Sequence, residues 1–184
     1  MMPPVKKSRK RVVLGVTGSI AIYKACEIIR QLKKDGFAID VIMTKESEEF
    51  IRPFLFQSLS GNKVYSGLFE TPESMDIEHI SLAEKADLIV IVPATANIIG
   101  KIASGICDDL LSCVVCAASS KVLLCPAMNE RMYRNPIVQS NIKKLKSLGY
   151  IIIEPRDGML ACGKAGIGCL ADADIIVKEI KRLA

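Results

Sequence analysis

Arg11-Val-Val-Leu-Gly-Val-Thr17, a short run of mostly branched aliphatic residues, leads directly into an amphipathic stretch that covers residues 20–34. The run is typical of a buried β-strand. In the stretch that follows, apolar residues recur near helical spacing until Asp35-Gly36 stops the pattern. A strand that passes at once into a helix is the first half of a βαβ unit, which indicates a parallel sheet.

The same alternation continues along the chain. Further strand-like runs cover residues 37–43, 87–92, 121–125 and 150–153. Helical patterns cover residues 47–60 (interrupted at Pro53), 96–103, 108–118, 136–148 and 172–183, and a loop is expected from 154 to 171. The pattern predicts an α/β protein with a three-layer α/β/α architecture, built on a doubly wound parallel sheet that is flavodoxin-like or Rossmann-like. One domain is expected over residues 11–184, behind a basic leader at residues 1–10.

Composition and charge narrow the classes of function. Half of the residues are hydrophobic, but no apolar run reaches the roughly 18 residues that span a bilayer, so no membrane segment is expected. The net charge is +5, and five positive charges precede or begin the first strand: Lys6, Lys7, Arg9, Lys10 and Arg11. The rest of the chain therefore balances, which argues against nucleic acid as a partner. The leader is interpreted as a solvated arm, with a nucleic-acid or localisation role as the alternative, and a cytoplasmic location is expected.

Seven cysteines in a chain of this kind do not suggest a disulfide framework. Cys113 and Cys116 form a C-x-x-C pair close to Cys107, but the surrounding run is helical and apolar. No second pair has zinc-finger spacing, so these three are predicted to be buried helix cysteines, and no metal site is expected. Cys162 and Cys169 differ because they lie in a glycine-rich segment.

Three polar motifs follow predicted strands, where ligands bind in doubly wound folds. Gly15-Val-Thr-Gly-Ser-Ile20 offers backbone N–H groups and a helix start to a phosphate, although an ordinary tight turn explains it too. Met43-Thr-Lys-Glu-Ser47 offers hydroxyls that could equally cap a helix. Pro93-Ala-Thr-Ala-Asn97 leaves room for a flat ring and can bond its edge, or can simply cap the next helix.

Three further features suggest chemistry. His79 is the only histidine, placed just before a short helical stretch, and can exchange protons near neutral pH or serve the structure alone. In Pro126-Ala-Met-Asn-Glu-Arg-Met-Tyr133, Asn129 can hold a substrate carboxylate or cap a helix. The stretch Gly158-Met-Leu-Ala-Cys-Gly-Lys-Ala-Gly-Ile-Gly-Cys169 is a flexible loop in which a cysteine can act as an acid, nucleophile or redox group.

Pro126-Ala-Met-Asn129 and Leu160-Ala-Cys-Gly163, in this order and with His79 upstream, resemble the motifs of the homo-oligomeric flavin-containing cysteine decarboxylases. The likeness covers about residues 9–184 and implies a flavoprotein decarboxylase domain. It implies that FMN is bound by Gly18, Ser19, Ile20, Thr44, Ser47, Ala94, Thr95, Ala96, Asn97 and Ala127. His79 is the implied catalytic histidine, Asn129 holds the substrate carboxylate, and Cys162 donates a proton from a flap. The implied substrate-binding residues are Met128, Asn129, Ala161, Cys162 and Gly163.

Within that family the likeness is to enzymes that convert 4′-phospho-N-pantothenoylcysteine to 4′-phosphopantetheine in coenzyme A biosynthesis. Oxidation of the CH2–SH carbon to a thioaldehyde creates an electron sink, so carbon dioxide can leave to give an enethiol, which hydride and a proton then reduce. The resemblance also implies a homotrimer or a dodecamer of trimers, with FMN and substrate at subunit contacts. A phosphopantothenoylcysteine synthetase is expected as a separate partner, or as a domain missing from this piece of chain.

Two positions depart from the family pattern. Tyr133 stands where Trp is usual, and Cys169 stands where many members carry Arg, which removes a guanidinium. Four alternatives stay open. They are a peptide-cysteine decarboxylase of the lantibiotic type, a flavin prenyltransferase, a regulatory phosphatase-binding flavoprotein subunit and a flavodoxin-like electron carrier. Leu160-Ala-Cys-Gly163 argues against the first, and Pro126-Ala-Met-Asn129 with His79 argues against the second. The regulatory subunits typically carry acidic extensions, whereas this chain has a short basic leader, and an electron carrier would lack a substrate-facing Asn, His and Cys.

Overall fold

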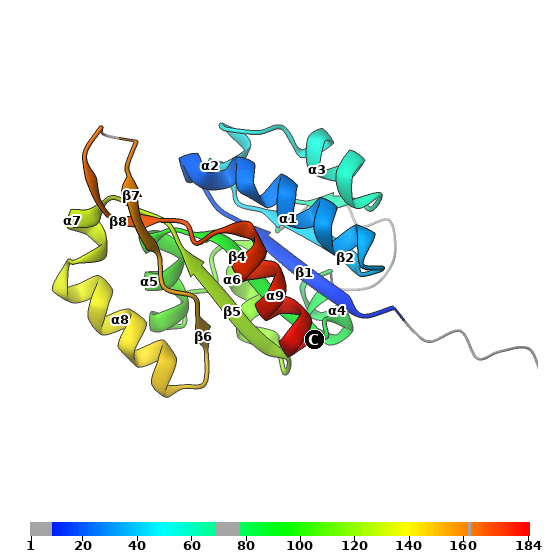
Figure 1. The fold of residues 1–184 in the computed structure, drawn as a ribbon. Helices are drawn as coiled ribbons and strands as arrows, with labels where there is room; N and C mark the ends of the chain where they lie inside the picture. The colour runs from blue at the N-terminus through cyan, green and yellow to red at the C-terminus, as the bar shows by residue number, and fades with distance from the viewer. Residues whose placement is uncertain (1–8, 69–77, 162) are drawn as a thin grey trace, which may run out of the picture.

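The computed structural model describes residues 9–68, 78–161 and 163–184, and Figure 1 shows the arrangement of their helices and strands. The predictions that fall on residues 1–8 and on Cys162 lie outside the described residues. Within the described ranges, no helix combines the length and the apolar character needed to cross a membrane.

A six-stranded parallel sheet forms the middle layer, in the order β3-β2-β1-β4-β5-β6. The strands are β1 (Arg11–Val16), β2 (Ala38–Met43), β3 (Val64–Tyr65), β4 (Leu88–Ala94), β5 (Lys121–Pro126) and β6 (Ile151–Ile152). This is the Rossmann order, and the direction of winding reverses between β1 and β4. The predicted fold class is therefore confirmed, with the Rossmann alternative selected over the flavodoxin order.

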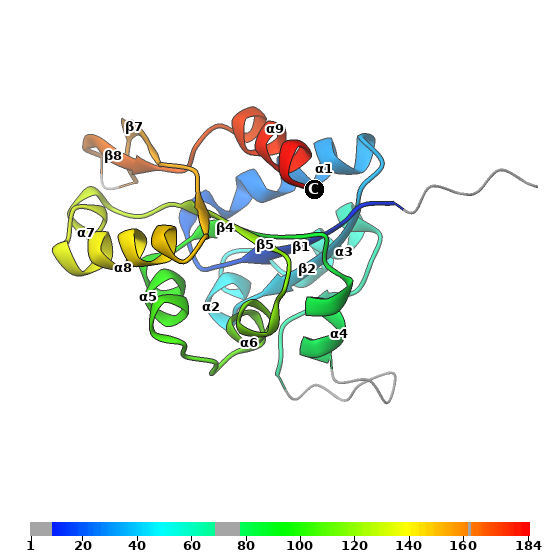
Figure 2. The same cartoon turned by 90° about the horizontal axis from the view of Figure 1, so that it is seen from below.

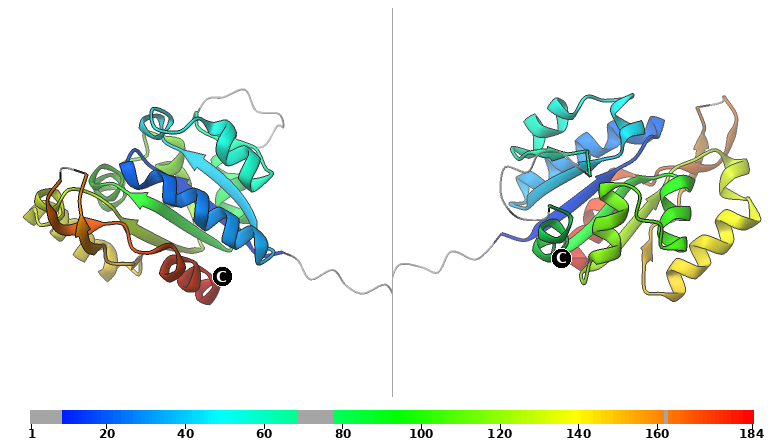
Figure 3. Two further views of the ribbon diagram at one scale, coloured as in Figure 1. Left: turned by 45° about the horizontal axis from the view of Figure 1, so that its top comes forward. Right: turned by 180° about the vertical axis from the view of Figure 1, so that it is seen from behind.

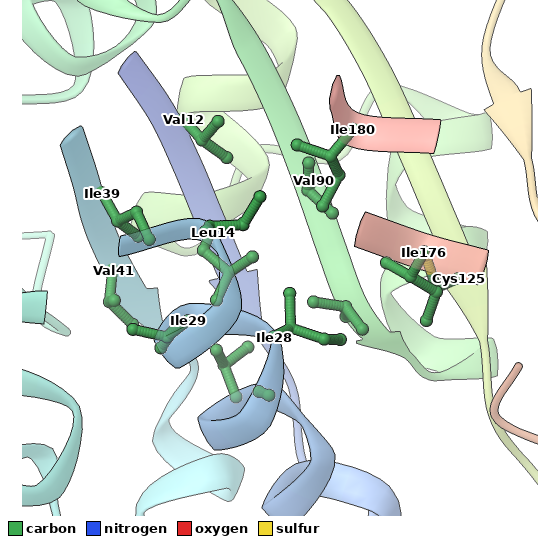
Figure 4. Close-up of a cluster of buried hydrophobic side chains, with 14 of the residues drawn as sticks. Val12, Leu14, Ile28, Ile29, Ile39, Val41, Val90, Cys125, Ile176 and Ile180 are labelled. Carbon is green, nitrogen blue, oxygen red and sulfur yellow. The ribbon is translucent and has the colours of Figure 1, made fainter. Parts of the chain in front are cut away.

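Helices cover both faces of the sheet (Figure 2). They are η1 (Ile20–Ile22), α1 (Tyr23–Lys34), α2 (Lys45–Glu48), α3 (Pro53–Ser60), α4 (Glu78–Lys85), α5 (Ala96–Ser104), α6 (Leu110–Ala117), α7 (Glu130–Tyr133), α8 (Pro136–Ser147) and α9 (Ala173–Leu183). Helices α1 and α9 pack on one face, where side chains such as Leu14, Ile28 and Ile176 interlock (Figure 4). Helices α4, α5, α6 and α8 supply the core of the other face.

The expectation of a loop over 154–171 is wrong, because this segment contains an antiparallel hairpin of β7 (Arg156–Met159) and β8 (Ala165–Cys169). Strand β7 is Arg-Asp-Gly-Met, and in β8 the small or apolar residues are separated by Gly166 and Gly168. Glycine is depleted in strands and typical of loops, so the segment was interpreted as a loop. Instead the two strands pair with each other, and β8 also bonds to the loop after β5, where Met128 N–H donates to the Gly168 carbonyl at 3.0 Å. Figure 3 shows this hairpin at the end of the sheet where α7 lies.

Smaller differences concern the helices. Pro53 begins α3 at its first turn rather than interrupting a longer helix, since proline suits the first helical position. The stretch 20–34 starts with the 3₁₀ turn η1 before α1 proper. His79 lies within α4 rather than before it. The two-residue strand β3 was not expected, because it is too short to show a pattern.

Candidate active site at the carboxyl edge of the sheet

Thr17 joins the two loops that meet where the sheet reverses its winding. It directly follows β1, and its side chain is only 2% exposed. Its hydroxyl donates to the Pro93 carbonyl at 2.7 Å and accepts from the Thr95 N–H at 3.2 Å. The loop after β1 is thereby held against the loop after β4. A hydroxyl at the end of an otherwise apolar strand was the sequence signal for this role, but Thr17 was not among the predicted site residues.

Two hollows open at this edge. The first measures about 380 Å³ and is lined by Ser19, Ile20, Ala21, Tyr23, Lys24, Ala127, Met128, Asn129, Arg156, Met159, Leu160, Ala161, Gly168, Cys169 and Leu170. The second measures about 240 Å³ and is lined by Thr17, Gly18, Thr44, Glu46, Thr95, Ala96, Asn97, Ile98, Asp109 and Met132. The turn from Thr17 to Ala21 contributes to both, so it forms a shared wall between them.

The second hollow lies where the loops after β1, β2 and β4 converge. Thr44 and Thr95, which line it, occupy the N-cap positions of α2 and α5, and Gly18 comes from the turn after β1. Gly18 permits this convergence, because a Cβ atom there would lie 2.8 Å from the Cβ atom of Glu46. Backbone N–H groups at helix starts attract anions, so this hollow suits a phosphate.

Thr44 supplies the most informative polar atom of the second hollow. Its hydroxyl is buried and finds no hydrogen-bond partner among the described residues, although Thr44 stands at an N-cap position. Ser19 and Thr95 use their hydroxyls to accept from Ala21 N–H and Ile98 N–H, each at 3.4 Å. A buried hydroxyl without a partner is costly, and a polar ligand in this hollow would satisfy it.

The structure distributes the predicted FMN-binding residues between the two hollows. Gly18, Thr44, Thr95, Ala96 and Asn97 line the second, whereas Ser19, Ile20 and Ala127 line the first. Ser47 and Ala94 are fully buried and are not among the lining residues of either hollow. The Ser47 hydroxyl instead donates to the Thr44 carbonyl at 2.6 Å, so it supports the loop that carries Thr44.

Asn129 stands at the first hollow and also caps α7. Its Oδ1 accepts from Arg131 N–H at 2.9 Å, which confirms the alternative interpretation of Asn129 as a helix cap. The hairpin packs beside it, and the approach is so close that a Cβ atom on Gly168 would lie 2.1 Å from the Met128 carbonyl oxygen. Gly168 has φ +140°, a conformation that favours glycine. The loop after β5 and strand β8 thus form one continuous wall.

The tip of the hairpin borders the same hollow. Leu160 N–H donates to the Lys164 carbonyl and Gly163 N–H donates to the Leu160 carbonyl, both at 2.9 Å, which closes a tight turn. Ala161 and Leu160 line the hollow, whereas Gly163 is exposed and has φ +76°. Cys162 lies outside the described residues, so its predicted role stays a prediction.

His79 is not brought to either hollow. It is half-buried in the first turn of α4, which packs against α6. Figures 1 and 3 place α4 at the end of the molecule opposite the hairpin. Within one chain, His79 and the predicted residues of the carboxyl edge are therefore separate.

Two cationic residues of the first hollow were missed. Lys24 follows the motif Gly15–Ile20 in α1, and Arg156 begins β7. The register of the hairpin pairs Arg156 with Cys169, so a guanidinium lies at this point although position 169 carries none. The Cys169 thiol donates to the Met159 carbonyl at 3.4 Å. Only folding brings helix α1 beside this hairpin, so no local pattern could have shown the pair.

Tyr133, one of the two positions that depart from the family pattern, lies outside both hollows. Its ring is buried in the core beneath α5 and α8, and its hydroxyl donates to Glu154. Burial and this carboxylate raise the pKa of Tyr133 to about 12. Neither hollow is lined by Tyr133, whereas its neighbour Met132 lines the second. The change from Trp therefore affects packing.

The three cysteines around α6 are not buried as predicted. Cys107 and Cys116 are exposed and Cys113 is partly buried, because Cys107 precedes the Asp109 cap instead of lying in the helix. A hydrogen bond with Cys116 and burial raise the pKa of Cys107 to about 11, so its thiol is not activated. Among the described residues, no group of three or more His, Cys, Asp or Glu side chains could hold a metal ion.

The chain belongs to the Flavoprotein family, which it matches over residues 2–184. It is 44% identical over 174 residues to a probable phosphopantothenoylcysteine decarboxylase of Streptococcus mutans, covering 94% of this chain and 97% of that protein. It is 45% identical over 171 residues to the coenzyme A biosynthesis bifunctional protein CoaBC of Bacillus subtilis, covering 93% of this chain. The chain spans only 42% of the length of that relative. The expected family is thereby confirmed.

Solved structures are similar to this chain over almost its full length. A cysteine-to-serine mutant of a PPC decarboxylase complexed with pantothenoylaminoethenethiol superposes with a TM-score of 0.82 at 28% identity, covering 95% of this chain and 98% of that one. The FMN-dependent cysteine decarboxylase SpaF gives a TM-score of 0.82 at 29% identity, covering 95% and 97%. In both cases the match covers 95% of this chain.

Proposed function

We propose that the protein is an FMN-dependent decarboxylase that converts 4′-phospho-N-pantothenoylcysteine to 4′-phosphopantetheine in coenzyme A biosynthesis. The observation that carries the proposal is the pair of adjacent hollows that share the wall from Thr17 to Ala21. One suits the phosphate of a nucleotide-like cofactor. The other is bounded by Asn129 and by the hairpin tip at Leu160, a place for a substrate beside that cofactor.

The residues present fit FMN. The starts of α2 and α5 and the turn at Gly18 meet at the second hollow, and the unpartnered Thr44 hydroxyl gives a phosphate or ribityl oxygen a hydrogen-bond donor. Ala96 and Asn97 provide a small face and an amide for the edge of a ring. FMN, when bound, supplies a two-electron acceptor that later returns the hydride, so the net reaction needs no outside reductant.

The chain's own residues then position the substrate and move protons. Asn129 holds the substrate carboxylate, and its place on the rigid loop after β5 fixes the bond that breaks. The hairpin limits the access of water to the thioaldehyde and enethiol. Cys162 delivers the proton that completes reduction of the enethiol to the saturated thiol.

His79 acts, in this proposal, from a second copy of the chain. It lies on α4 and lines neither hollow of its own chain, so a histidine at the site needs another subunit. Large apolar side chains exposed at the first hollow support such an assembly, because Ile20 and Tyr23 are 59% and 61% exposed. We infer a homotrimer, or a dodecamer of trimers, in the cytoplasm, with a phosphopantothenoylcysteine synthetase as the partner that supplies substrate. The decarboxylase domain would cover residues 11–184, behind the leader 1–10.

The test is to purify the protein, record its visible spectrum, add 4′-phospho-N-pantothenoylcysteine and follow the products by mass spectrometry. A flavin spectrum and a product lighter by one carbon dioxide are expected. A product lighter by two further hydrogens would show that the reaction ends at the enethiol, as the peptide-cysteine alternative predicts. A colourless protein that cannot be loaded with FMN would refute the proposal.

A further inference from the structure

One end of the first hollow is cationic. Among the described residues that line it, Lys24 and Arg156 are the charged ones, and none is Asp or Glu. The two side chains come from different layers of the fold, α1 and the hairpin, and meet near Asp172 at the start of α9. The end of the hollow therefore carries two cationic side chains that share one carboxylate.

Lys24 is the more confined of the two. Its side chain is 17% exposed, and its Nζ reaches the Leu170 carbonyl at 3.4 Å and the Asp172 carboxylate at 4.0 Å. Both contacts are at the long limit for an ammonium group, whose good hydrogen bonds are about 2.7–2.9 Å. Lys24 also lies in the first turn of the twelve-residue helix α1, where the helix dipole adds positive potential. A confined cation with only long contacts favours an anion from outside the chain.

Arg156 lies at the same cationic end of the first hollow. Its Nε donates to the Asp172 carboxylate at 3.0 Å, and its Nη1 donates to the Asp157 carbonyl at 3.2 Å. Asp172 is 60% exposed and is shared between both cations, so one carboxylate opposes two positive charges. A guanidinium offers several donors in one plane, which suits a phosphate.

We propose that Lys24 and Arg156 form a subsite for the phosphate of the substrate's pantothenoyl arm. The inference rests on the proposed function and deepens it, because it assigns the end of the substrate opposite the carboxylate that Asn129 holds. The cofactor phosphate has its own place in the second hollow, beside the Thr44 hydroxyl and beyond the wall at Thr17 and Gly18. The subsite would make the enzyme prefer phosphorylated substrates.

The test compares two ligands that differ only in the phosphate. Binding of 4′-phosphopantetheine and of pantetheine, both kept reduced, is measured by calorimetry on the FMN-loaded protein. The variants are Lys24→Gln and Arg156→Gln, with the charge-retaining Lys24→Arg and Arg156→Lys as folding-matched partners. Lys181→Gln is the matched control, because Lys181 pairs with Asp35, the C-cap of α1, and lies outside the hollow.

We expect the wild type to prefer the phosphorylated ligand, and each Gln variant to lose about tenfold or more of that preference, the usual worth of one charge-assisted hydrogen bond. Affinity for pantetheine should stay unchanged, and the charge-retaining and Lys181 variants should keep most of the preference. Equal weakening of both ligands, or an unchanged preference, would overturn the inference. Loss of FMN but not of riboflavin would assign the cations to the cofactor phosphate instead, which also overturns it. A preserved preference without any decarboxylation by the wild type would refute the proposed function alone.

Discussion

Replacing Thr17 with valine tests whether the hydroxyl at the winding reversal holds the site together. The substitution keeps the branched shape and removes a donor to Pro93 and an acceptor from Thr95, at 2.7 and 3.2 Å. The Pro93 carbonyl would stay buried without its bond, and the Thr95 N–H would lose its partner at a partly buried position. An unsatisfied buried group costs about 1–3 kcal/mol, so we expect a loss of roughly 2–4 kcal/mol in the free energy of unfolding.

The measurement is urea unfolding of the FMN-free and FMN-loaded protein at one fixed protein concentration, because ligand binding and assembly both add to apparent stability. Thr17→Ser is the matched control, since it keeps the hydroxyl and loses only a methyl group. We expect weaker FMN binding in Thr17→Val because the loops after β1 and β4 separate. A valine variant as stable as the serine variant, with unchanged FMN affinity, would show that the hydroxyl does not connect the loops.

Three further outcomes follow from the geometry. Gly168→Ala should displace the hairpin, because the added methyl group would meet the Met128 carbonyl at 2.1 Å; KM for the substrate should rise at least tenfold while FMN content holds, and an unchanged KM would contradict the packing. Tyr133→Phe should cost about 1 kcal/mol of stability at neutral pH through the lost bond to Glu154. Burial opposes ionisation of Glu154, but Lys146 and Tyr133 outweigh it and lower its pKa, so this contribution is present above the unfolded pKa of about 4.3 and is lost as pH falls through the folded value. The free energies of unfolding of the wild type and Tyr133→Phe, measured in urea, should therefore become equal in acid. A constant difference between them down to pH 3 would argue against the bond between Tyr133 and Glu154. Cys162→Ser should halt the reaction at the enethiol, seen by mass spectrometry as a product two hydrogens short, and formation of the ordinary saturated thiol would exclude Cys162 as proton donor.

The layered architecture could be predicted because its strands are buried on both faces. The run from Arg11 to Val16 and the later β4 and β5 read as continuous apolar stretches, and each is followed by a polar turn and a helix. The order of strands was out of reach, because both doubly wound orders give the same alternation along the chain. The hairpin was missed because both of its short strands contain glycine, which is typical of loops and depleted in strands.

The candidate site was predictable where its residues follow a strand. Gly18, Thr44 and Thr95 come directly after β1, β2 and β4, so parallel pairing must gather them at one edge. Lys24 and Arg156 are 132 positions apart, and their meeting depends on how α1 and the hairpin pack. The separation of His79 from the edge likewise depends on the position of α4, which no spacing rule supplies.

Because of the way the hairpin is attached, the residues that hold the cofactor and the residues that select the substrate can change independently. Strand β8 is fixed to the loop after β5 through Gly168, whereas Met159, Ala161 and Lys164 near the tip are exposed. Exchange of residues 159–165 between homologues would therefore leave the Rossmann core and the loops that line the second hollow intact. Evolution can then change which substrate the protein accepts by substituting a few exposed residues near the hairpin tip. The stability of the sheet that holds the flavin would not change.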